Sequence, residues 1–519
     1  MNVKKNDNKK SSLVIVYHRQ PYEEVEIDGR VEYRENKSPN GIVPTLKSFF
    51  GSVDKGTWVA WKKHDAEGAP EWEPRVTFDD QYGSYDVCRI PLTSEEVSSF
   101  YHVTSKEALW PILHSFPWHF DVSNTDWATF REVNRRFAEA ACEQAADDAL
   151  IWVHDYNLWL VPHFVRKLKP HARIAFFHHT PFPAADIFNI LPWREEIVES
   201  LLTCDLIGFH IPRYVNNFVQ VARSISGVRT EERIPAPRGL AGHGLALGTD
   251  DMVPAVRHNG RRVQLDACPV GTNPTLIREL LATEAGRDRV TEIREDLGDS
   301  KLIVSIGRVD YSKGTREMLE TYERLLERRP ELRGHVRLLV TSVSAAAGMS
   351  VYDETRHDIE HLVGRINGRF SSLTWAPIRL LTSTLPFDEV VACYAAADIC
   401  WTTPLRDGLN LVAKEFIAAH EGREGALVLS EFTGVSAELT SAILVNPYSR
   451  RSMDEAIDEA LAMEPSEQRA RVTAMAKKVS DYDIEHWAEH VMKRFAALRP
   501  QPIRVPEPDA EPELTAAAG

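Results

Sequence analysis

The segment Pro404-Leu-Arg-Asp-Gly-Leu-Asn-Leu-Val-Ala-Lys-Glu415 predicts a turn between a buried strand and a helix. An apolar run at 398–403 precedes it, and apolar side chains recur at helical spacing over 411–417. The first amides of such a helix carry partial positive charge, which suits a diphosphate. Asp407 lies at the turn, and Glu415 lies further along the helix, where it can accept from a ribose hydroxyl. An ordinary turn with a capping aspartate is the alternative that this segment alone leaves open.

A second junction of the same kind lies earlier in the chain. The apolar run 302–306 leads into Gly307-Arg-Val-Asp-Tyr-Ser-Lys-Gly314, and a helical pattern follows. Arg308 and Lys313 are thus expected at the carboxyl end of a parallel strand, where open α/β sheets bind ligands. A guanidinium fork and a point charge together suit the oxygens of a pyrophosphate. Solvated loop cations are the alternative, but two such junctions in one half of the chain favour a diphosphate site.

The composition narrows the class of protein. The chain has 519 residues, 43% of them apolar, which is enough for two domains with buried cores. A net charge of −15 argues against a nucleic-acid partner. The 6 cysteines show no paired spacing, as in a reduced cytosolic protein. The first apolar run, 13–17, is too short for a signal peptide, and no run is long enough to span a membrane. We therefore expect a cytoplasmic protein without a membrane partner.

Strand-like runs alternate with helical patterns along most of the chain, which predicts an α/β fold with mostly parallel sheets. We expect two Rossmann-like domains facing a cleft, at 12–266 and 267–480, followed by a C-terminal helix at 481–499. Residues 500–519 are rich in Pro, Glu and Ala and are expected to be disordered. The polar region 229–259 is expected to form an extended loop of the first domain, part of it poorly ordered. The strand-like runs are 13–17, 150–154, 173–178, 205–210, 262–267, 302–306, 336–341, 398–402, 426–429 and 443–445.

Polar side chains end two of the runs in the first half. Asp155 follows the run 150–154, and His178 and His179 end the run 173–178. Parallel strands would bring these groups to one sheet edge, facing the second domain. A carboxylate and an imidazole there can bind sugar hydroxyls or assist proton transfer. A capping aspartate and core histidines are the alternatives.

Five ordered motifs resemble the trehalose-6-phosphate synthase family of retaining glycosyltransferases, over roughly residues 13–498. The family implies a GT-B architecture: two Rossmann-like domains, a donor site in the second, and a last helix that crosses back to the first. It also implies no metal and no cofactor other than a nucleotide-sugar co-substrate. The motifs are His154-Asp-Tyr156, Phe176-Phe-His-His-Thr-Pro-Phe-Pro183, Arg308-Val-Asp-Tyr-Ser-Lys-Gly314, Gly364-Arg-Ile-Asn-Gly368 and Arg406-Asp-Gly-Leu-Asn-Leu-Val-Ala-Lys-Glu415.

The resemblance implies a role for each matching residue. Arg308 and Lys313 would hold the donor diphosphate, Glu415 the ribose, and Arg19 the acceptor phosphate. The residues implied for the donor are Arg308, Lys313, Asp407, Leu411, Val412 and Glu415. Those implied for the acceptor are Arg19, Tyr101, Trp110 and Asp155, with Trp58 or Trp61 beside them. Those implied for catalysis are Asp155, His179, Arg308, Lys313 and Asp407.

Two spellings near the end of the chain resemble metal motifs. His486-Trp-Ala-Glu-His490 matches a zinc-protease pattern, and Asp481-Tyr-Asp483 matches the DxD of metal-dependent sugar transferases. No third zinc ligand is evident, and a DxD should end a strand, whereas these aspartates precede an amphipathic helix. No metal is therefore expected.

The chain departs from trehalose-6-phosphate synthases in the loop after 336–341. Ser342-Val-Ser-Ala-Ala-Ala-Gly348 contains no cation, whereas those enzymes typically carry an arginine there for glucose 6-phosphate. Losing such a charge-assisted contact costs about 1.5–3 kcal/mol, which favours a different acceptor. The loop 36–51 has no Gly-Gly pair and is similar to the branch of the family that acts on glycerol 3-phosphate. The region 229–259 and Pro269-Val-Gly-Thr-Asn-Pro274 favour the same branch.

The resemblance to this branch implies glucose transfer from ADP-glucose to glycerol 3-phosphate with retention, giving glucosylglycerol phosphate, the precursor of a compatible solute used under salt stress. The first alternative is trehalose-6-phosphate synthesis from UDP-glucose and glucose 6-phosphate. The second is a catalytically silent sugar-phosphate-binding regulatory subunit. The expected partners are small-molecule substrates, and a homo-oligomer remains open.

Overall fold

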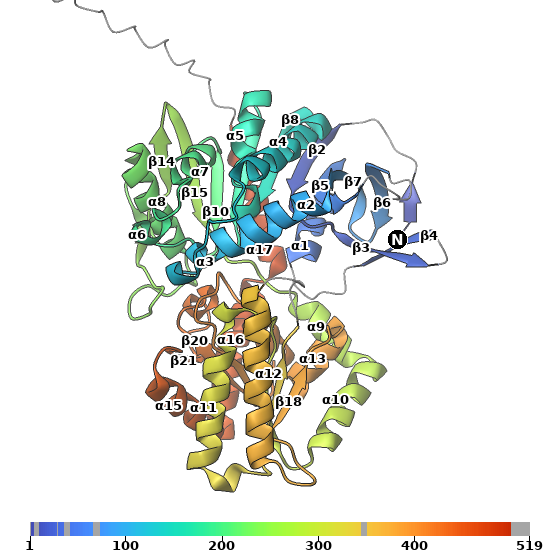
Figure 1. The fold of residues 1–519 in the computed structure, drawn as a ribbon, viewed down its shortest axis with the longest axis vertical. Helices are drawn as coiled ribbons and strands as arrows, with labels where there is room; N and C mark the ends of the chain where they lie inside the picture. Colours follow the sequence, from blue (N-terminus) through green and yellow to red (C-terminus); the bar gives the residue numbers. More distant parts are fainter. Residues whose placement is uncertain are drawn as a thin grey trace, which may run out of the picture.

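The protein consists of two α/β lobes, one above the other in Figure 1. The upper lobe is built from the first half of the chain and the lower lobe from most of the second half. The tail 500–519 and residues 344–348 of the loop 342–348 lie outside the described residues, so the structure does not test what was expected of them. The computed structural model describes residues 2–4, 10–27, 30–35, 42–65, 73–343 and 350–499.

Within the described residues, the upper lobe contains one eleven-stranded sheet. Its central strands run parallel, and the apolar β2 is buried there almost throughout. Because β2, β8 and β9 are parallel neighbours, Arg19, Asp155 and His179 follow strand ends at one edge of the sheet. The strand order is β1 (Asn2–Lys4), β6 (Arg75–Asp80), β7 (Gly83–Leu92), β5 (Gly56–Lys63), β2 (Ser11–Val16), β8 (Ala145–His154), β9 (Arg173–His178), β10 (Leu206–Phe209), β15 (Arg261–Ala267), β14 (Ala255–His258) and β11 (Arg229–Thr230).

Helices cover this sheet, and their ends follow ordinary capping rules. Asp126 begins α4 by accepting hydrogen bonds from the amides of Ala128 and Thr129. Pro212 occupies the first turn of α8, and Gly227 ends that helix with a left-handed φ of 58°. The upper-lobe helices are α1 (Ile42–Ser48), α2 (Ser94–Val97), a π-helical stretch (Ser98–Leu109), α3 (Trp110–Leu113), α4 (Trp127–Gln144), α5 (Val161–Leu168), α6 (Ala185–Phe188), α7 (Arg194–Leu201) and α8 (Pro212–Ser226).

The lower lobe has a six-stranded parallel sheet among its described residues. Side chains alternate across it: Ile303 packs toward α11, α12 and α15, whereas Leu302 and Val304 pack toward α13, α14 and α16. The strand order is β18 (Ile378–Leu381), β17 (Val336–Thr341), β16 (Lys301–Ser305), β19 (Ile399–Thr402), β20 (Ala426–Ser430) and β21 (Ile443–Val445). The helices are α9 (Pro274–Ala282), α10 (Glu284–Leu297), α11 (Thr315–Arg328), α12 (Ser350–Phe370), α13 (Phe387–Ala396), α14 (Leu411–Ala419), α15 (Arg450–Ala462) and α16 (Pro465–Asp481).

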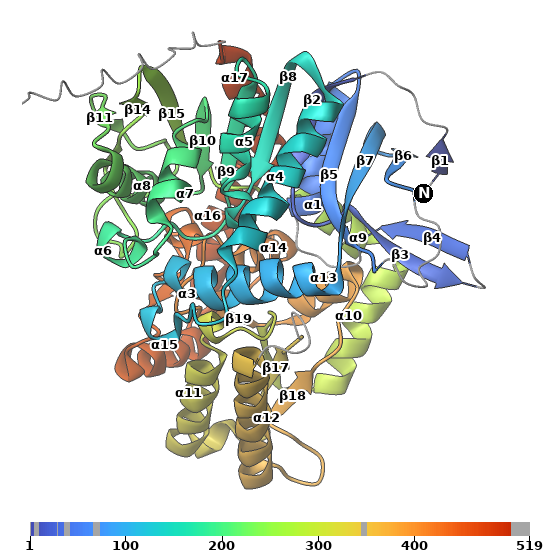
Figure 2. The same ribbon diagram turned by 45° about the horizontal axis from the view of Figure 1, so that its top comes forward.

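The last helix, α17 (Ile484–Ala497), returns to the upper lobe, as Figures 1 and 2 both show. Trp487 is fully buried, with its ring 5.7 Å from that of Trp152, and its Nε1 donates to the carbonyl of Cys268 at 3.2 Å. Asp483 caps the helix, and His490 Nε2 lies 2.7 Å from an oxygen of Asp266. Asp483, from the DxD-like pattern, therefore serves as a helix cap, and His490, from the zinc-protease-like pattern, contacts an aspartate.

The region 229–259 is part of the folded upper lobe. The structure describes every residue of the region, and the expectation that part of it is poorly ordered stays a prediction. β11 and β14 extend the large sheet, and β12 (Ile234–Pro235) pairs with β13 (Asp251–Met252). Ala241 also donates its amide to the carbonyl of Ala437 in the lower lobe, at 2.8 Å.

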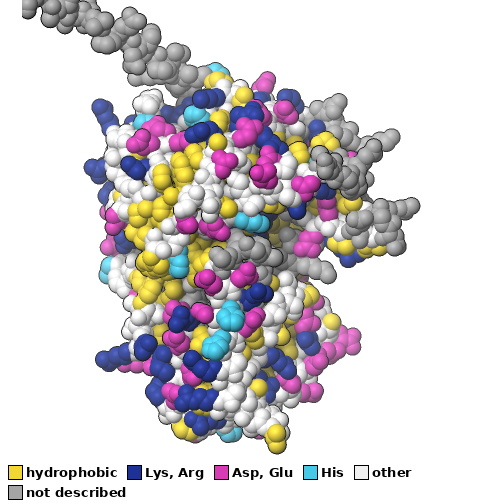
Figure 3. Space-filling model, viewed as in Figure 1, with side chains coloured by type: hydrophobic (Ala, Val, Ile, Leu, Met, Phe, Trp, Pro, Cys, Tyr) yellow, Lys and Arg dark blue, Asp and Glu magenta, His cyan; other side chains and the backbone are white. Residues whose placement is uncertain are grey.

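The surface agrees with an ordinary acidic protein. On the face that Figure 3 shows, Lys and Arg side chains are intermixed with Asp and Glu. Such mixing gives no extended basic stripe on that face of the kind that nucleic-acid binding requires. Among the described residues, no helix combines the length and the apolar character needed to cross a membrane.

Candidate active site

A cavity of about 770 Å³ lies between the two lobes. The upper lobe contributes residues that follow β2, β9 and β10, and the lower lobe contributes residues from the ends of β16, β17 and β19 and from α14. Three of the expected site residues, Tyr101, Trp110 and Asp155, do not line this cavity. The expected residues that do line it are Arg19, His179, Arg308, Lys313, Asp407, Leu411, Val412 and Glu415.

The lobes approach each other closely at Gly408. A Cβ atom there would lie 2.3 Å from the carbonyl oxygen of His179, so a larger residue would force the two backbones apart. Two hydrogen bonds cross nearby: Tyr214 donates to the carbonyl of Asp407 at 3.1 Å, and Arg406 donates to Ser115 Oγ at 3.2 Å. The absence of a side chain at Gly408 therefore permits this close approach of the two lobes beside the cavity.

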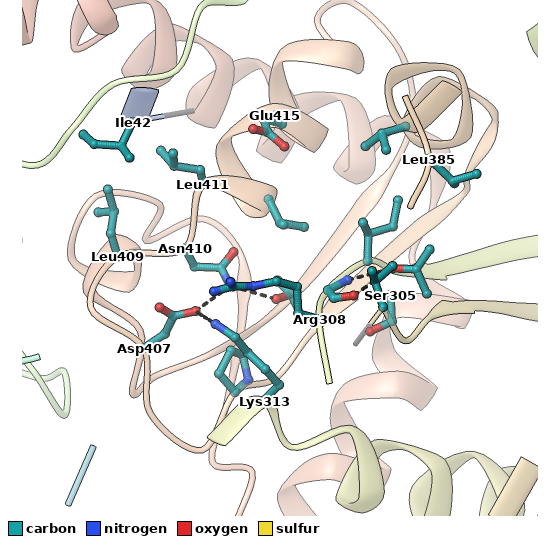
Figure 4. A pocket seen from close by; sticks show the side chains of 18 of the residues that line it. Ile42, Ser305, Arg308, Lys313, Leu385, Asp407, Leu409, Asn410, Leu411 and Glu415 are labelled. Carbon is teal, nitrogen blue, oxygen red and sulfur yellow. Dashed lines mark hydrogen bonds and ion pairs between the residues drawn. The ribbon is translucent and has the colours of Figure 1, made fainter. Parts of the chain in front are cut away.

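An ion pair marks the lower-lobe wall. Lys313 Nζ lies 2.7 Å from Asp407 Oδ2, and Asn410 donates to the same oxygen at 3.2 Å (Figure 4). Burial acts to raise the pKa of Asp407, but the charge of Lys313 outweighs it and the pKa is lowered. Asp407 is therefore ionised, and its second oxygen has no hydrogen-bond partner among the described residues.

The N-terminus of α14 faces the same space. Asn410 caps it with a left-handed φ of 83°, accepting from the amide of Ala413 at 3.1 Å. Leu411 and Val412 follow and line the cavity, so their amides can receive an anion. Arg308 lines the same cavity (Figure 4), and it pairs with no carboxylate among the described residues. A guanidinium and a helix N-terminus on one wall form a site for a diphosphate.

Glu415 lies at the end of the cavity away from Lys313 (Figure 4). Its side chain accepts from the hydroxyl of Tyr394 at 3.3 Å. Burial raises the pKa of Glu415 to about 7. Leu385, Pro386 and other apolar groups line the cavity as well. This end thus offers a hydrogen-bond acceptor beside an apolar surface, which suits a ribose and its base.

In the upper lobe, Asp155 supports the cavity wall from behind. It has a left-handed φ of 68°, which is uncommon for a residue with a side chain, and it is buried. Its Oδ1 accepts from the amide of His179 and from Thr180 Oγ1, each at 3.3 Å. Burial raises its pKa to about 6. In this structure Asp155 fixes the segment that carries His179.

His179 itself lines the cavity and is neutral. Its Nε2 lies 3.1 Å from Nδ1 of His154, so one ring donates to the other. Burial lowers the pKa of His179 well below its usual value, and the neighbouring His210 and His178 lower it further. A neutral imidazole at this position can bind a sugar hydroxyl.

Arg19 lines the cavity from the upper lobe, at the end where the resemblance to the family implies the acceptor. Its Nη2 donates to the hydroxyl of Tyr101 at 3.2 Å, so Tyr101 orients the guanidinium. Trp58 is fully buried and donates to the carbonyl of Arg19 at 2.8 Å, which places it behind the segment. Trp61 lies partly buried beside Tyr101, with the ring centroids 6.4 Å apart. Trp110 is also buried, and the ammonium of Lys106 lies 3.8 Å from the centroid of its ring.

Sequence reasoning did not single out Lys106, His210 or Asn410. Asn410 precedes a helical pattern, so the ordinary preference for asparagine at a helix start was the available signal. His210 follows β10 as His179 follows β9, which places it at the same sheet edge. Lys106 lies four residues before Trp110, a spacing that puts both side chains on one helix face.

Two Rossmann-like lobes with a diphosphate-type site between them define a GT-B glycosyltransferase. A solved structure from E. coli bound with UDP-2-fluoro glucose matches the fold with a TM-score of 0.81 and 28% identity, covering 94% of this chain and 100% of that one. The expected GT-B fold class is thereby confirmed. Residues 11–497 match the model of glycosyltransferase family 20. The chain belongs to this family and is a retaining glycosyltransferase.

Relatives within the family differ in how similar they are to this chain. The glucosylglycerol-phosphate synthase of Synechocystis is 55% identical over 487 residues, covering 94% of this chain and 98% of the relative. The trehalose-6-phosphate synthase of Mycolicibacterium gilvum is 35% identical over 496 residues, covering 95% of each chain. The resemblance to the glucosylglycerol-phosphate branch is thus confirmed.

Proposed function

We propose that the protein transfers glucose from ADP-glucose to glycerol 3-phosphate with retention of configuration, giving glucosylglycerol phosphate. The observation that carries the proposal is the contrast in similarity: 55% identity with a glucosylglycerol-phosphate synthase against 35% with a trehalose-6-phosphate synthase. The loop 342–348 supports it, because this loop has no arginine to bind the phosphate of a glucose 6-phosphate acceptor.

The donor is proposed to lie along the lower-lobe wall. Arg308, Lys313 and the first amides of α14 would bind the diphosphate, and Glu415 would accept from the ribose. The free oxygen of Asp407 and the ring of His179 would hold the glucose. No cofactor is proposed besides the nucleotide sugar. Among the described residues, no group of three His, Cys, Asp or Glu side chains is arranged to hold a metal ion.

The reaction is proposed to occur on one face of the sugar. The acceptor hydroxyl oxygen forms a bond to the anomeric carbon while the bond from that carbon to the diphosphate breaks. The hydroxyl proton passes to the departing diphosphate, so ADP leaves and no enzyme-bound sugar forms. Arg308 and the helix amides stabilise the charge that develops on the diphosphate, and closure of the lobes excludes water.

The product would serve as precursor of a compatible solute under salt stress, and we propose that synthesis takes place in the cytoplasm. All six cysteines are free in the structure, and five are buried, which suits a reducing compartment.

A donor-by-acceptor activity matrix tests this function. ADP-glucose and UDP-glucose are each incubated with glycerol 3-phosphate and with glucose 6-phosphate, and the phosphorylated product is measured. ADP-glucose with glycerol 3-phosphate is expected to give the highest kcat/KM. Preference for glucose 6-phosphate would instead identify trehalose-6-phosphate synthesis, and no turnover in any combination would indicate a silent binding subunit.

A further inference from the structure

Lys106 is a buried cation near the acceptor end of the cavity. It belongs to the π-helical stretch Ser98–Leu109, a conformation that is frequent at functional sites, and the residue is 7% exposed. Its ammonium lies 3.8 Å above the ring of Trp110. Throughout the described part of the chain, no carboxylate forms an ion pair with Lys106 and no oxygen accepts a hydrogen bond from it.

A buried ammonium without an anion is unfavourable, and its neighbours add to the cost. Burial lowers the pKa of Lys106, and although Tyr101 and Asp310 act to raise it, the charges of Arg308 and Arg19 lower it further. The contact with Trp110 offsets only part of this cost, because a ring face attracts a cation less strongly than a carboxylate does. Lys106 and Arg19 both lie against Tyr101, with Lys106 Nζ 5.9 Å from the ring centroid and Arg19 Nη2 3.2 Å from the hydroxyl oxygen.

The charges of Lys106 and Arg19 both act on the hydroxyl of Tyr101. Burial acts to raise the pKa of its hydroxyl, but Lys106 and Arg19 outweigh burial and lower the pKa to about 8. The hydroxyl of the buried Tyr352 lies near Tyr101 and has no hydrogen-bond partner among the residues that the structure describes. Positive charge and an unused hydroxyl together form surroundings that suit a small dianion.

We propose that Lys106 and Arg19 together bind the phosphate of the acceptor, so that Lys106 supplies the positive charge that the loop 342–348 lacks. The inference rests on the proposed function for the identity of the acceptor as glycerol 3-phosphate. Two cations from the upper lobe balance a phosphate dianion and leave Lys313 and the helix amides for the donor. A short acceptor held from this side would present its hydroxyl toward the glucose.

The test compares Lys106→Met, which keeps the apolar stem, with Lys106→Arg, which keeps the charge. For Lys106→Met, KM for glycerol 3-phosphate is expected to rise about ten- to a hundredfold, the range for losing one charge-assisted contact, with KM for ADP-glucose unchanged. Competitive inhibition by inorganic phosphate against the acceptor is expected to weaken by a similar factor. Lys106→Arg is expected to retain most of both. Lys167→Met, which removes an exposed lysine of α5, is the matched control.

An unchanged acceptor KM and an unchanged phosphate inhibition constant in Lys106→Met would overturn the inference. So would an equal rise of both substrates' KM with a lowered Tm, because that pattern indicates a structural role beneath Trp110. Should Lys106→Met fold poorly, Lys106→Gln provides the same comparison. If the wild-type protein uses only glucose 6-phosphate, the proposed function fails, yet phosphate inhibition against that acceptor still decides the role of Lys106.

Discussion

The two ends of the cavity differ in how their charges are balanced. At the donor end, Lys313 pairs with Asp407 at 2.7 Å and Asn410 supports the same carboxylate. At the acceptor end, Arg19 contacts the hydroxyl of Tyr101, and neither Arg19 nor Lys106 pairs with a carboxylate among the described residues. The proposed donor end therefore contains a preformed ion pair beside the unpaired Arg308, whereas both cations of the proposed acceptor end require an anion from the substrate.

The largest effect should come from removing the unpaired cation of the donor end. In Arg308→Ala, kcat/KM is expected to fall about 10²–10³-fold, because a donor aimed at developing charge contributes on this scale. Steady-state kinetics with ADP-glucose and glycerol 3-phosphate measure the loss. Arg450→Ala, an exposed arginine of α15, should leave kcat/KM unchanged. Near-normal turnover of Arg308→Ala would remove its diphosphate role.

A second effect should follow from a substitution that keeps the two lobes apart. In Gly408→Ala, the new Cβ meets the carbonyl of His179 at 2.3 Å, so the lobes must shift at the site. Overpacking of this kind costs about 1–3 kcal/mol of stability, and activity should fall with it. Thermal unfolding and kcat/KM are the measurements. Gly368→Ala, a helical glycine with no atom within 4 Å of its Cβ, should be neutral or stabilising. Equal behaviour of the two variants would contradict a close approach at Gly408.

A smaller, pH-dependent effect should distinguish the donor end from the acceptor end. Burial raises the pKa of Glu415 to about 7, so the side chain is protonated below that pH and ionised above it. Only the ionised form accepts from both ribose hydroxyls, so donor affinity should improve as pH rises through about 7. Glu415→Gln should remove this dependence and weaken donor binding about tenfold at pH 8. Calorimetric titration of ADP at pH 6 and pH 8 measures both, and a wild-type affinity that weakens with rising pH would oppose the assignment.

The smallest effect should come from a contact outside either end. His490 and Asp266 are partly exposed, with side chains 33% and 16% exposed, and such pairs contribute about 1 kcal/mol or less. His490→Ala should therefore lower Tm by a few degrees at most and leave kcat unchanged. Addition of a chelator should change neither value in the wild-type protein. Loss of activity on chelation would revive the zinc interpretation of this segment.

The central strands and the position of the junction after β16 were predictable from the sequence because their signals are local. Buried parallel strands such as β2 and β16 are continuous apolar runs, and Arg308 and Lys313 lie within one junction. The exposed strand β11 carries no such run. The pairing of Lys313 with Asp407, 94 residues apart in the chain, and the burial of Lys106 depend on how distant segments meet. No local pattern encodes those contacts.

A crystal structure with ADP and glycerol 3-phosphate tests the division between the two ends most directly. The account predicts the diphosphate within hydrogen-bond distance of Arg308 and the first amides of α14, and the acceptor phosphate within hydrogen-bond distance of Arg19 and Lys106. An acceptor phosphate bound elsewhere, with Lys106 still contacting only the ring of Trp110, would contradict the proposed acceptor end. A diphosphate that does not contact Arg308 would contradict the account as a whole.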